Sequence, residues 1–377
     1  MDKNIVITRS NPVKPDSRVE KEALSLYKAG YNVKVLCWDR DSSHPEKEEF
    51  LEFGDIKIPV IRLGFKASFG DGMKNIIPYL KFQFAMRKWI RKHKNEISLL
   101  HACDFDTAFF TYRLAHRKKI KVVFDIFDFI GSDRKTFFQR VLSKLQYDII
   151  KRSDATIICT EERKKQIDGS TPQKLTVIHN TPSEAQLVQN LAQHPSDNGK
   201  IRVCYVGILQ PGRLLEEIGE YFSENHEVEF HIGGFGFLET YFKELSAAND
   251  NIKYYGRLSY DKTLALENDC DIMLAIYDPR LDNHIFAAPN KFYESLFLGK
   301  PVIMVKGTGM SSVIENNDVG CLIDYSKESF ASGIDSLIAR KDEWTAMSAK
   351  SKELYREKYN WTVMEKRLVD LYKSLLG

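Results

Sequence analysis

The sequence predicts an α/β protein built from two Rossmann-like domains, and three observations support this fold class. With 377 residues the chain exceeds one ordinary hydrophobic core, so two domains of about 180 residues each are expected. A strand, a helix and a second strand follow one another within residues 3–38. An apolar strand pattern then restarts at residues 201–207, after a polar stretch without periodicity. Because strands that alternate with helices are typical of parallel sheets, both halves are expected to be α/β.

Composition and charge restrict the class of protein further. Hydrophobic residues make up 43% of the chain and charged residues 28%, which is typical of a folded soluble protein. No signal peptide or membrane-spanning stretch is recognisable, so we expect a cytoplasmic protein. The net charge of +3 is too small to indicate nucleic-acid binding. The six cysteines are scattered without a C-x-x-C pair, which indicates reduced thiols.

The first half contains the strands and helices of an open parallel sheet. A strand at residues 4–8, a helix at about 18–29 and a strand at 32–36 open it, and the loop between them lacks the G-x-G-x-x-G pattern of dinucleotide-binding oxidoreductases. Further strands are expected near residues 97–100, 121–125, 153–160 and 174–178. The first of these runs into an expected polar loop with His101 and Asp104. Ligands of such sheets collect at the carboxyl ends of strands. Asp125 and Asp128 follow another strand, where capping of the next helix is the alternative.

The second half repeats this pattern around glycines. The strand at residues 201–207 ends at Gly207, which lets a ligand approach the backbone closely, and Arg213 precedes a helix. An alternative for Arg213 is an exposed ion pair with Glu216 or Glu217. The strand near residue 230 enters a glycine-rich turn at Gly234. We expect further strands at residues 251–258, 270–277, 302–305 and 319–323.

Residues 289–303 are the most informative stretch of the second half. Aromatic and aliphatic residues four apart predict a short helix that begins at Pro289 and Asn290 and ends at Gly299. Glu294 is the lone carboxylate among these apolar residues, and a buried carboxylate needs a partner. Lys291 lies in the first turn, beside backbone amides that attract anions. An ion pair between Glu294 and Lys291 inside an ordinary core helix is the alternative.

These residues resemble the retaining family four of the GT-B glycosyltransferases, also called glycosyl transferases group 1. The strongest match is the P-N-K-x-x-E motif at residues 289–294, and the D-x-R-V-x-x-E-A opening at residues 16–23 is also found in many members. His101 and Asp104 match an H-A-H-D segment of the family, in which Cys103 here replaces the second His. The resemblance covers nearly the whole chain and is strongest from residue 201 to residue 323.

The resemblance implies a GT-B fold and a set of site residues. An acceptor-binding domain (1–183) and a donor-binding domain (201–360) would face each other across a cleft, joined by a linker at 184–200, with a C-terminal helix (361–377) returning to the first domain. Glu294 would accept hydrogen bonds from the donor ribose, while Arg213 and Lys291 would contact the diphosphate. The remaining candidates are Gly207, Gly234, Gly256, Arg257 and Asn290 on the donor side, with Gly256 and Arg257 near the base, and Arg18, His101 and Asp104 on the acceptor side.

The implied activity is retaining, metal-independent transfer of a sugar from a nucleotide diphosphate sugar, with UDP-sugars favoured. The acceptor would be a hydroxyl of a saccharide or lipid-linked saccharide in cell-surface polysaccharide assembly. No cofactor and no metal site is expected. The segments 104–106 and 269–271 look like a metal-binding D-x-D, but cationic side chains are expected where a metal would act.

Three positions depart from the family pattern and leave alternatives open. Phe127 replaces a His near the donor sugar, Ile208 replaces an Arg, and Phe286 replaces a first Glu. We therefore assign the polar group near the sugar to Asp128. A non-catalytic GT-B partner subunit that binds a nucleotide sugar, or a GT-B sugar-nucleotide epimerase or hydrolase, remain as alternatives.

A basic amphipathic helix is predicted between residues 74 and 94. Lys74, Lys81 and Lys88 recur every seven residues and alternate with apolar side chains. Such a helix can rest on an anionic membrane surface, which would make the protein peripheral to the inner face of a membrane. A solvated face on an ordinary packed helix is the alternative.

Overall fold

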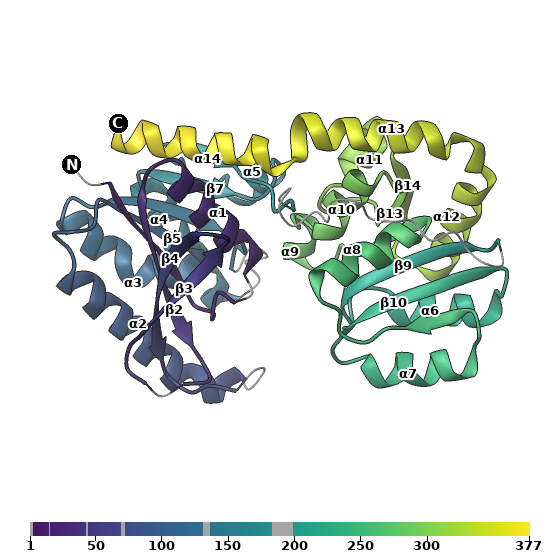
Figure 1. Cartoon of the computed structure of the whole chain (residues 1–377), viewed down its shortest axis with the longest axis horizontal. Coiled ribbons are helices and arrows are strands. Elements are labelled where there is room, and N and C mark those ends of the chain that lie inside the picture. The colour runs from purple at the N-terminus through teal and green to yellow at the C-terminus, as the bar shows by residue number, and fades with distance from the viewer. Residues whose placement is uncertain (1–2, 15, 43, 69–71, 131–135, 183–198) are drawn as a thin grey trace. The chain divides into compact units, whose positions relative to one another are not determined.

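The computed structural model describes residues 3–14, 16–42, 44–68, 72–130, 136–182 and 199–377 (Figure 1). The chain forms two compact units, one of Met1–Ile178 with Met364–Gly377 and the other of His179–Val363. The predicted linker at residues 184–200 lies outside the described residues, apart from Gly199 and Lys200.

Unit 1 is built on a sheet of eight strands in the order β3-β4-β2-β1-β5-β6-β7-β8. All its neighbouring strands are parallel except the hairpin of β3 and β4, which the sequence analysis did not anticipate. Its elements are β1 (Asn4–Arg9), α1 (Ser17–Lys28), β2 (Asn32–Asp39), β3 (Lys47–Phe53), β4 (Ile56–Gly64), η1 (Gly72–Asn75), α2 (Ile76–Lys92), β5 (Leu99–Cys103), α3 (Asp104–Arg117), β6 (Lys121–Ile126), α4 (Phe137–Arg152), β7 (Ala155–Ile158), α5 (Arg163–Gln166) and β8 (Leu175–Val177).

Helices cover both faces of this sheet because parallel strands are joined by right-handed crossovers. The chain moves one way along the sheet from β1 to β2 and the other way from β4 to β5, β6 and β7. The crossover helix α1 therefore lies on one face, and α2, α3 and α4 lie on the other. Helix α3 packs against both α2 and α4, so these three helices form one layer.

Unit 2 is a sheet of six parallel strands in the order β11-β10-β9-β12-β13-β14. Its elements are β9 (Ile201–Ile208), α6 (Leu215–Glu224), β10 (Val228–Phe235), α7 (Glu239–Ala248), β11 (Ile252–Tyr254), α8 (Tyr260–Asp269), β12 (Ile272–Ala275), α9 (Asp282–Ile285), α10 (Asn290–Leu298), β13 (Val302–Val305), α11 (Ser311–Asn317), β14 (Gly320–Ile323), α12 (Lys327–Ala339), η3 (Lys341–Glu343), α13 (Trp344–Leu354) and the π-helix η4 (Tyr355–Tyr359).

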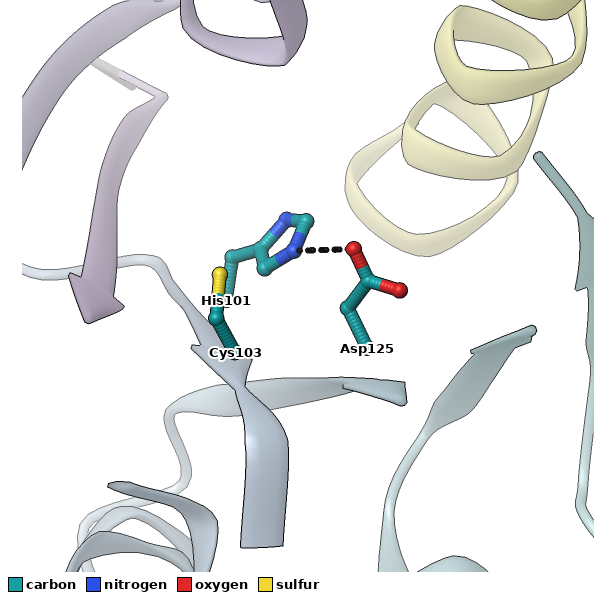
Figure 2. A group of neighbouring side chains, drawn as sticks. All are labelled: His101, Cys103 and Asp125. Atoms are coloured by element: carbon teal, nitrogen blue, oxygen red, sulfur yellow. Dashed lines mark ion pairs between the residues drawn. The ribbon is translucent and has the colours of Figure 1, made fainter. Parts of the chain in front are cut away.

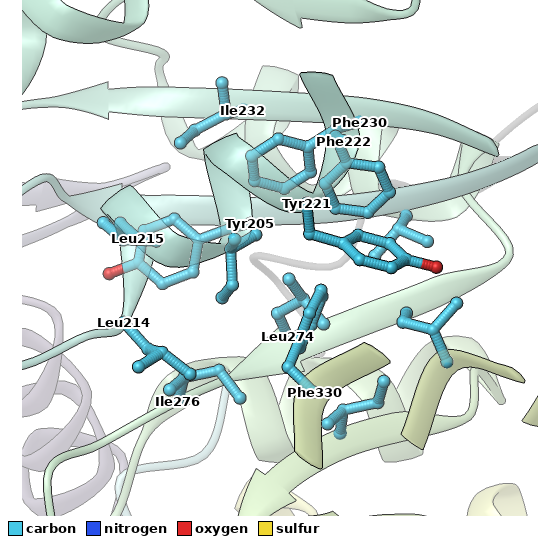
Figure 3. Packing of buried hydrophobic residues seen from close by; sticks show 14 of the residues in the cluster. Tyr205, Leu214, Leu215, Tyr221, Phe222, Phe230, Ile232, Leu274, Ile276 and Phe330 are labelled. Carbon is cyan, nitrogen blue, oxygen red and sulfur yellow. The ribbon is translucent and has the colours of Figure 1, made fainter. Parts of the chain in front are cut away.

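The core of unit 2 holds the sheet and its helices in a fixed arrangement. Leu215, Ile218 and Phe222 recur at helical spacing on α6 and are buried against the sheet. Phe222 stacks on Phe230 of β10 with ring centroids 4.6 Å apart, and Phe330 of α12 packs edge-on against Phe222. Figure 3 shows these residues in the core. Burial of a large aromatic side chain stabilises the fold by about 1.5–3 kcal/mol. The strand ends that carry the candidate site are thereby supported by a rigid core.

The last helix, α14 (Trp361–Leu376), belongs to unit 1 from Met364 onward. Its Leu368 and Tyr372 are fully buried there. The Tyr372 hydroxyl forms a hydrogen bond of 2.5 Å with Nδ1 of His101 in β5. A buried polar contact of this kind attaches the end of the chain to the first sheet.

Candidate functional site

A pocket of about 230 Å³ opens in unit 2 at the carboxyl ends of β9 and β10 and at the start of α10. In open parallel sheets, ligands bind at this edge. Six predicted donor-side residues line the pocket together: Gly207, Gly234, Arg257, Asn290, Lys291 and Glu294. Its other lining residues include Phe235, Leu258, Tyr260 and Thr263.

Helix α10 has the boundaries that the sequence predicts. Pro289 is its N-cap with φ of −70°, and Gly299 ends it in the left-handed conformation with φ of +70°. A Cβ at Gly299 would lie 2.3 Å from Oγ of Ser348, so only glycine fits this end of the helix. At the other end of the helix, Asn290 and Lys291 of the first turn line the pocket, and the amides of a helix start attract anions.

Glu294 lines the pocket although only 3% of the residue is exposed. The Tyr260 hydroxyl hydrogen bonds to its carboxylate, and burial together with the Glu294 charge raises the pKa of Tyr260. Glu294 therefore lies at the wall of a cavity rather than in a closed core. A carboxylate in this position can accept hydrogen bonds from a ligand's hydroxyl groups.

Lys291 is held between an aromatic ring and a glycine. Its Nζ lies 4.6 Å from the centroid of the Tyr205 ring. A Cβ at Gly207 would lie only 2.6 Å from this Nζ, so the ammonium occupies the space that the glycine leaves. Burial opposes the charge, but Tyr205, Tyr277 and Glu294 together hold the pKa of Lys291 above its ordinary value. Lys291 is therefore a cation at neutral pH.

Arg213 lies close enough to Lys291 to oppose its charge. Its guanidinium stacks on Tyr277, with Cζ 3.7 Å from the ring centroid. Nε and Nη1 of Arg213 are buried and have no hydrogen-bond partner among the described residues. Nor does Arg213 form an ion pair with Glu216 or Glu217 there, so this alternative from the sequence is not supported. Two cations with unused donors suit a diphosphate.

The glycine-rich turn after β10 packs too closely for a side chain. Gly234 has φ of +142°, and a Cβ there would lie 1.8 Å from the carbonyl oxygen of Gly207. Its amide donates to the carbonyl of Gly256 over 2.7 Å. Gly256 thus supports the pocket from behind and does not line it. Arg257 lies over the ring of Phe235, with Cζ 4.6 Å from the centroid.

A second buried carboxyl group lies behind Glu294. Glu267 of α8 is 1% exposed, and neither of its carboxyl oxygens has a hydrogen-bond partner among the described residues. Burial and the charge of Glu294 raise the pKa of Glu267 well above its ordinary value, while Lys291 opposes this shift. Glu267 therefore favours its protonated form more strongly than an exposed carboxyl group does.

The predicted acceptor-side residues lie at the carboxyl edge of the unit 1 sheet. The prediction of a polar loop after residue 100 is wrong, because β5 runs to Cys103 and α3 begins directly at Asp104. Asp104 has φ of +65°, and its Oδ1 accepts hydrogen bonds from the amides of Phe127 and Asp128 at 2.9 and 3.0 Å. Its Oδ2 pairs with Arg9, whose guanidinium covers the Phe127 ring. This contact fixes the loop after β6.

The Asp128 side chain is exposed on that loop. One of its carboxylate oxygens lies 3.5 Å from Nη2 of Arg163. The capping alternative is wrong for this segment, because Thr136 caps α4 in a capping box with Gln139. Asp125 does not cap the helix either, since it pairs with Arg18. The roles of Asp128 and the acceptor-side residues stay predictions.

His101 and Arg18 belong to a buried cluster with Glu22, Asp125 and Tyr372. Arg18 donates to both oxygens of Asp125, the shortest contact being 2.8 Å. Nε2 of His101 lies 3.4 Å from Asp125 (Figure 2), and it lies 3.6 Å from Glu22. Although burial opposes its charge, Arg18 and His101 hold the pKa of Asp125 below its ordinary value, and burial raises that of Glu22.

This cluster does not suit a metal, although ligand atoms of His101, Cys103 and Asp125 lie within 4.8 Å of one another. The Asp125 carboxylate is already occupied by Arg18, and Tyr372 occupies Nδ1 of His101. Burial raises the pKa of Cys103 well above its ordinary value, so the thiol stays protonated. Ion pairs balance the charges of the cluster instead.

Three tyrosines that contact the predicted site residues were missed by sequence reasoning, and one of them, Tyr260, lines the pocket. Tyr205 and Tyr277 hold the two cations, and Tyr260 holds Glu294. An aromatic residue within a strand, after a strand or at the start of a helix is equally typical of a core, so no sequence signal indicated these roles. In unit 1, Arg9 and Phe127 were missed as partners, because residues 9, 104 and 127 meet only in the folded sheet.

Two Rossmann-like units, the second with a pocket at its strand ends, are the architecture of the GT-B class. Residues 18–181 match the family model of Glycosyltransferase Family 4, and residues 200–340 match that of Glycosyl transferases group 1. These two models account for most of the chain, and the chain belongs to these glycosyltransferases. No curated protein matches the sequence.

Solved structures share the fold at low sequence identity. Sucrose-phosphate synthase from Thermosynechococcus elongatus is 14% identical, with a TM-score of 0.76 over 99% of both chains. The HepE protein of Anabaena in complex with UDP is 15% identical, with a TM-score of 0.68 over 99% of this chain and 100% of that one. The α,α-trehalose 6-phosphate synthase of Burkholderia multivorans is 12% identical, with a TM-score of 0.72 over 100% and 97%. These likenesses show the fold.

Proposed function

We propose that this glycosyltransferase transfers a sugar from a UDP-sugar to an acceptor hydroxyl, with retention at the anomeric carbon and without a metal. The observation that carries the proposal is the convergence of Glu294, Lys291 and Gly207 on one pocket, with Arg213 close to Lys291. In this proposal, Glu294 accepts hydrogen bonds from the ribose hydroxyls. The two cations and the first amides of α10 bind the diphosphate.

The same groups account for the chemistry of the leaving group. Departure of UDP builds negative charge on the phosphate oxygens, and donors that are already oriented stabilise this charge best. The buried N–H groups of Arg213 need no reorganisation, because no protein group competes for them among the described residues. Asp128 supplies the polar group near the donor sugar in this proposal, in place of the His that Phe127 replaces.

The preference for UDP is supported by relatives of the same fold. The Anabaena HepE protein has structures with UDP and with UDP-glucose, at 14–15% identity. The acceptor is proposed to be a saccharide or lipid-linked saccharide of cell-surface polysaccharide assembly. The site of action is proposed to be the cytoplasm, at the inner face of a membrane to which α2 binds. Among the described helices, none has both the length and the apolar character needed to cross a bilayer.

A panel of nucleotide sugars tests the proposal. The full-length protein is incubated with each sugar nucleotide and a set of saccharide and lipid-linked acceptors, and release of the nucleoside diphosphate is measured with and without EDTA. We expect release with a UDP-sugar, unchanged by EDTA, and a product whose anomeric configuration by NMR equals that of the donor. Inversion would refute the retaining mechanism, and loss of activity with EDTA would refute metal independence.

A non-catalytic partner subunit remains the second candidate, because Ile208, Phe127 and Phe286 are apolar where the family pattern has polar groups. That candidate predicts binding of the UDP-sugar without turnover for every acceptor. An epimerase or hydrolase predicts an altered or hydrolysed donor without any acceptor. Analysis of the sugar product by NMR in the same reactions separates these outcomes.

A further inference from the structure

We infer that the layer of helices α2, α3 and α4 in unit 1 forms a docking face for an anionic lipid bilayer. The inference extends the membrane part of the proposed function from one predicted helix to three, and it does not depend on glycosyl transfer. Four observations support it: exposed apolar residues on two helices, an aromatic link between them, an excess of cations, and a pocket lined by basic side chains.

Helix α2 presents apolar and basic residues on one exposed stripe. Ile77 is 66% exposed and Phe84 60%, and the basic residues Lys81, Lys88 and Arg91 share their helical face. No Asp or Glu occurs between Ile76 and Lys92. The opposite side of the helix packs Phe82, Met86 and Ile90 into the core. The exposed stripe is therefore a second face, which folding of unit 1 leaves open to water.

Helix α4 repeats this combination at its start. Phe137 is 76% exposed and Phe138 69%, and Val141 is also exposed. Arg140 and Lys144 lie on the same side as Phe137, three and seven residues further along the chain. Folded soluble proteins rarely expose several large apolar side chains together without a binding function. The pairing of phenylalanines with cations fits the interface of an anionic membrane.

Helix α3 connects the two stripes. Phe84 of α2 packs edge-on against Phe110 of α3, with centroids 5.7 Å apart, and Phe110 contacts Phe109 at 5.4 Å. Phe109 and Leu142 of α4 pack on the same core cluster. The layer spans about 25 Å along its helices, because each residue advances a helix by about 1.5 Å. The two apolar stripes thus lie on neighbouring helices of one layer.

The other end of the layer holds a basic pocket of about 370 Å³ between α3 and α4. A chain of hydrogen bonds shapes it: Nε of Arg113 donates to the Tyr112 hydroxyl, which donates to Asp148. Arg152 pairs with Asp148 across 2.6 Å. Arg117 also lines the pocket and forms no ion pair among the described residues. This pocket suits the phosphate of a lipid headgroup.

Flotation with lipid vesicles tests the docking face. The full-length protein is mixed with vesicles of phosphatidylcholine alone or with about one-third phosphatidylglycerol, since only the second carries the anionic charge that attracts Lys and Arg. We expect the protein to float with the anionic vesicles and to stay at the bottom with the neutral ones. A protein partner for this face would instead leave the chain at the bottom with both, which would overturn the inference.

Three double variants locate the binding. Phe84→Glu with Lys88→Glu on α2, and Phe137→Glu with Phe138→Glu on α4, are each expected to weaken partitioning at least about tenfold. Arg113→Gln with Arg117→Gln should weaken binding to anionic vesicles by a similar factor. Vesicle binding that survives the α4 changes would show that α4 is not part of the docking face, and the three-helix inference would fail.

A matched control uses the opposite face of the same sheet. Tyr27 and Lys28 are exposed on α1, so Tyr27→Glu with Lys28→Glu makes the same chemical change away from the layer. We expect this control to float like the parent protein. An equal loss in the control would overturn the inference. The binding constant for UDP and the urea midpoint, measured for every variant, separate a lost membrane contact from misfolding or a failed donor site.

Discussion

Nζ of Lys291 lies over the ring of Tyr205, 4.6 Å from its centroid, in the space that Gly207 leaves free. A cation on an aromatic face keeps its charge while its N–H groups stay available for a ligand. Arg213 repeats this arrangement on Tyr277. Aromatic rings thus orient both Lys291 and Arg213, the residues proposed to bind the diphosphate. The rings do not use up the N–H groups of these two side chains.

Replacement of either cation should slow sugar transfer. A hydrogen bond to a charged group contributes about 1.5–3 kcal/mol, so Arg213→Ala and Lys291→Ala are each expected to lower kcat/KM by about 10- to 150-fold. Steady-state release of UDP measures this effect. Lys262→Ala, at an exposed lysine of α8, serves as the control and should keep the parent rate. Unchanged turnover in the first two variants would refute their proposed roles.

The ribose role of Glu294 predicts a loss of donor affinity. Glu294→Gln keeps the shape of the side chain but removes the charge that strengthens hydrogen bonds from hydroxyl groups. We expect the dissociation constant of the UDP-sugar to rise at least about tenfold, as measured by calorimetry. Glu315→Gln changes an exposed carboxylate of α11 and should leave the constant unaltered. An equal affinity for parent and Glu294→Gln would remove the ribose contact from the proposal.

Alanine substitutions at two glycines of the pocket should differ in their effects on activity and stability. At Gly207 the new Cβ meets the flexible end of Lys291, so Gly207→Ala should displace the ammonium, lower kcat about tenfold and change stability by less than about 1 kcal/mol. At Gly234 the Cβ meets a backbone oxygen at 1.8 Å, so Gly234→Ala should cost about 3 kcal/mol or more. Urea denaturation and UDP release measured together check the contrast. Equal effects on stability would contradict it.

The raised pKa of Asp104 predicts that the stability of the protein depends on pH. Burial raises its pKa from 3.8 to about 6, so the folded state binds a proton more readily than the unfolded state between these values. Its contribution to stability is complete below about pH 4 and is lost as the pH rises through about 6. Because 21% of the side chain is exposed, we expect a loss of about 1–2 kcal/mol rather than the full value of the shift.

Asp104→Asn isolates this effect, because asparagine does not titrate in this range. The difference in unfolding free energy between parent and variant, measured in urea at pH 4, 5, 6 and 7, should shift against the parent as the pH rises. Other titrating groups are common to both proteins and cancel in the difference. A difference that stays constant across this range would show that the carboxyl is not perturbed.

The buried bond between Tyr372 and His101 predicts how firmly the last helix is attached to unit 1. Tyr372→Phe leaves Nδ1 of His101 without its partner in a fully buried site, which should cost about 1–3 kcal/mol of unfolding free energy. Tyr27→Phe, at an exposed tyrosine of α1, should be within about 0.5 kcal/mol of the parent. Equal urea midpoints for the two variants would contradict this role of the hydroxyl.

Much of the fold could be predicted from the sequence because the signals are local. The alternation of strands and helices identified both α/β units, and Pro289 with Gly299 gave the bounds of α10, since capping depends on a few adjacent residues. The P-N-K-x-x-E motif likewise placed Lys291 and Glu294 on one short helix, and both line the pocket. The hairpin of β3 and β4 was missed, although Gly54 and Asp55 between its strands are a pair typical of two-residue hairpin turns.

The sequence by itself thus determined two parallel-sheet units, the glycosyltransferase family, and a helix that carries Lys291 and Glu294. The signals for these features are periodicity, helix caps and short motifs, and each acts over about ten residues or fewer. Only the tertiary structure decided that Tyr205 and Tyr277 orient the cations and that Asp104 holds the Phe127 loop. It also decided that His101 lies in a closed cluster with Tyr372, 271 residues away along the chain. Such contacts depend on the packing of whole sheets, in which residues distant along the chain meet at strand ends. Short sequence patterns therefore do not predict them.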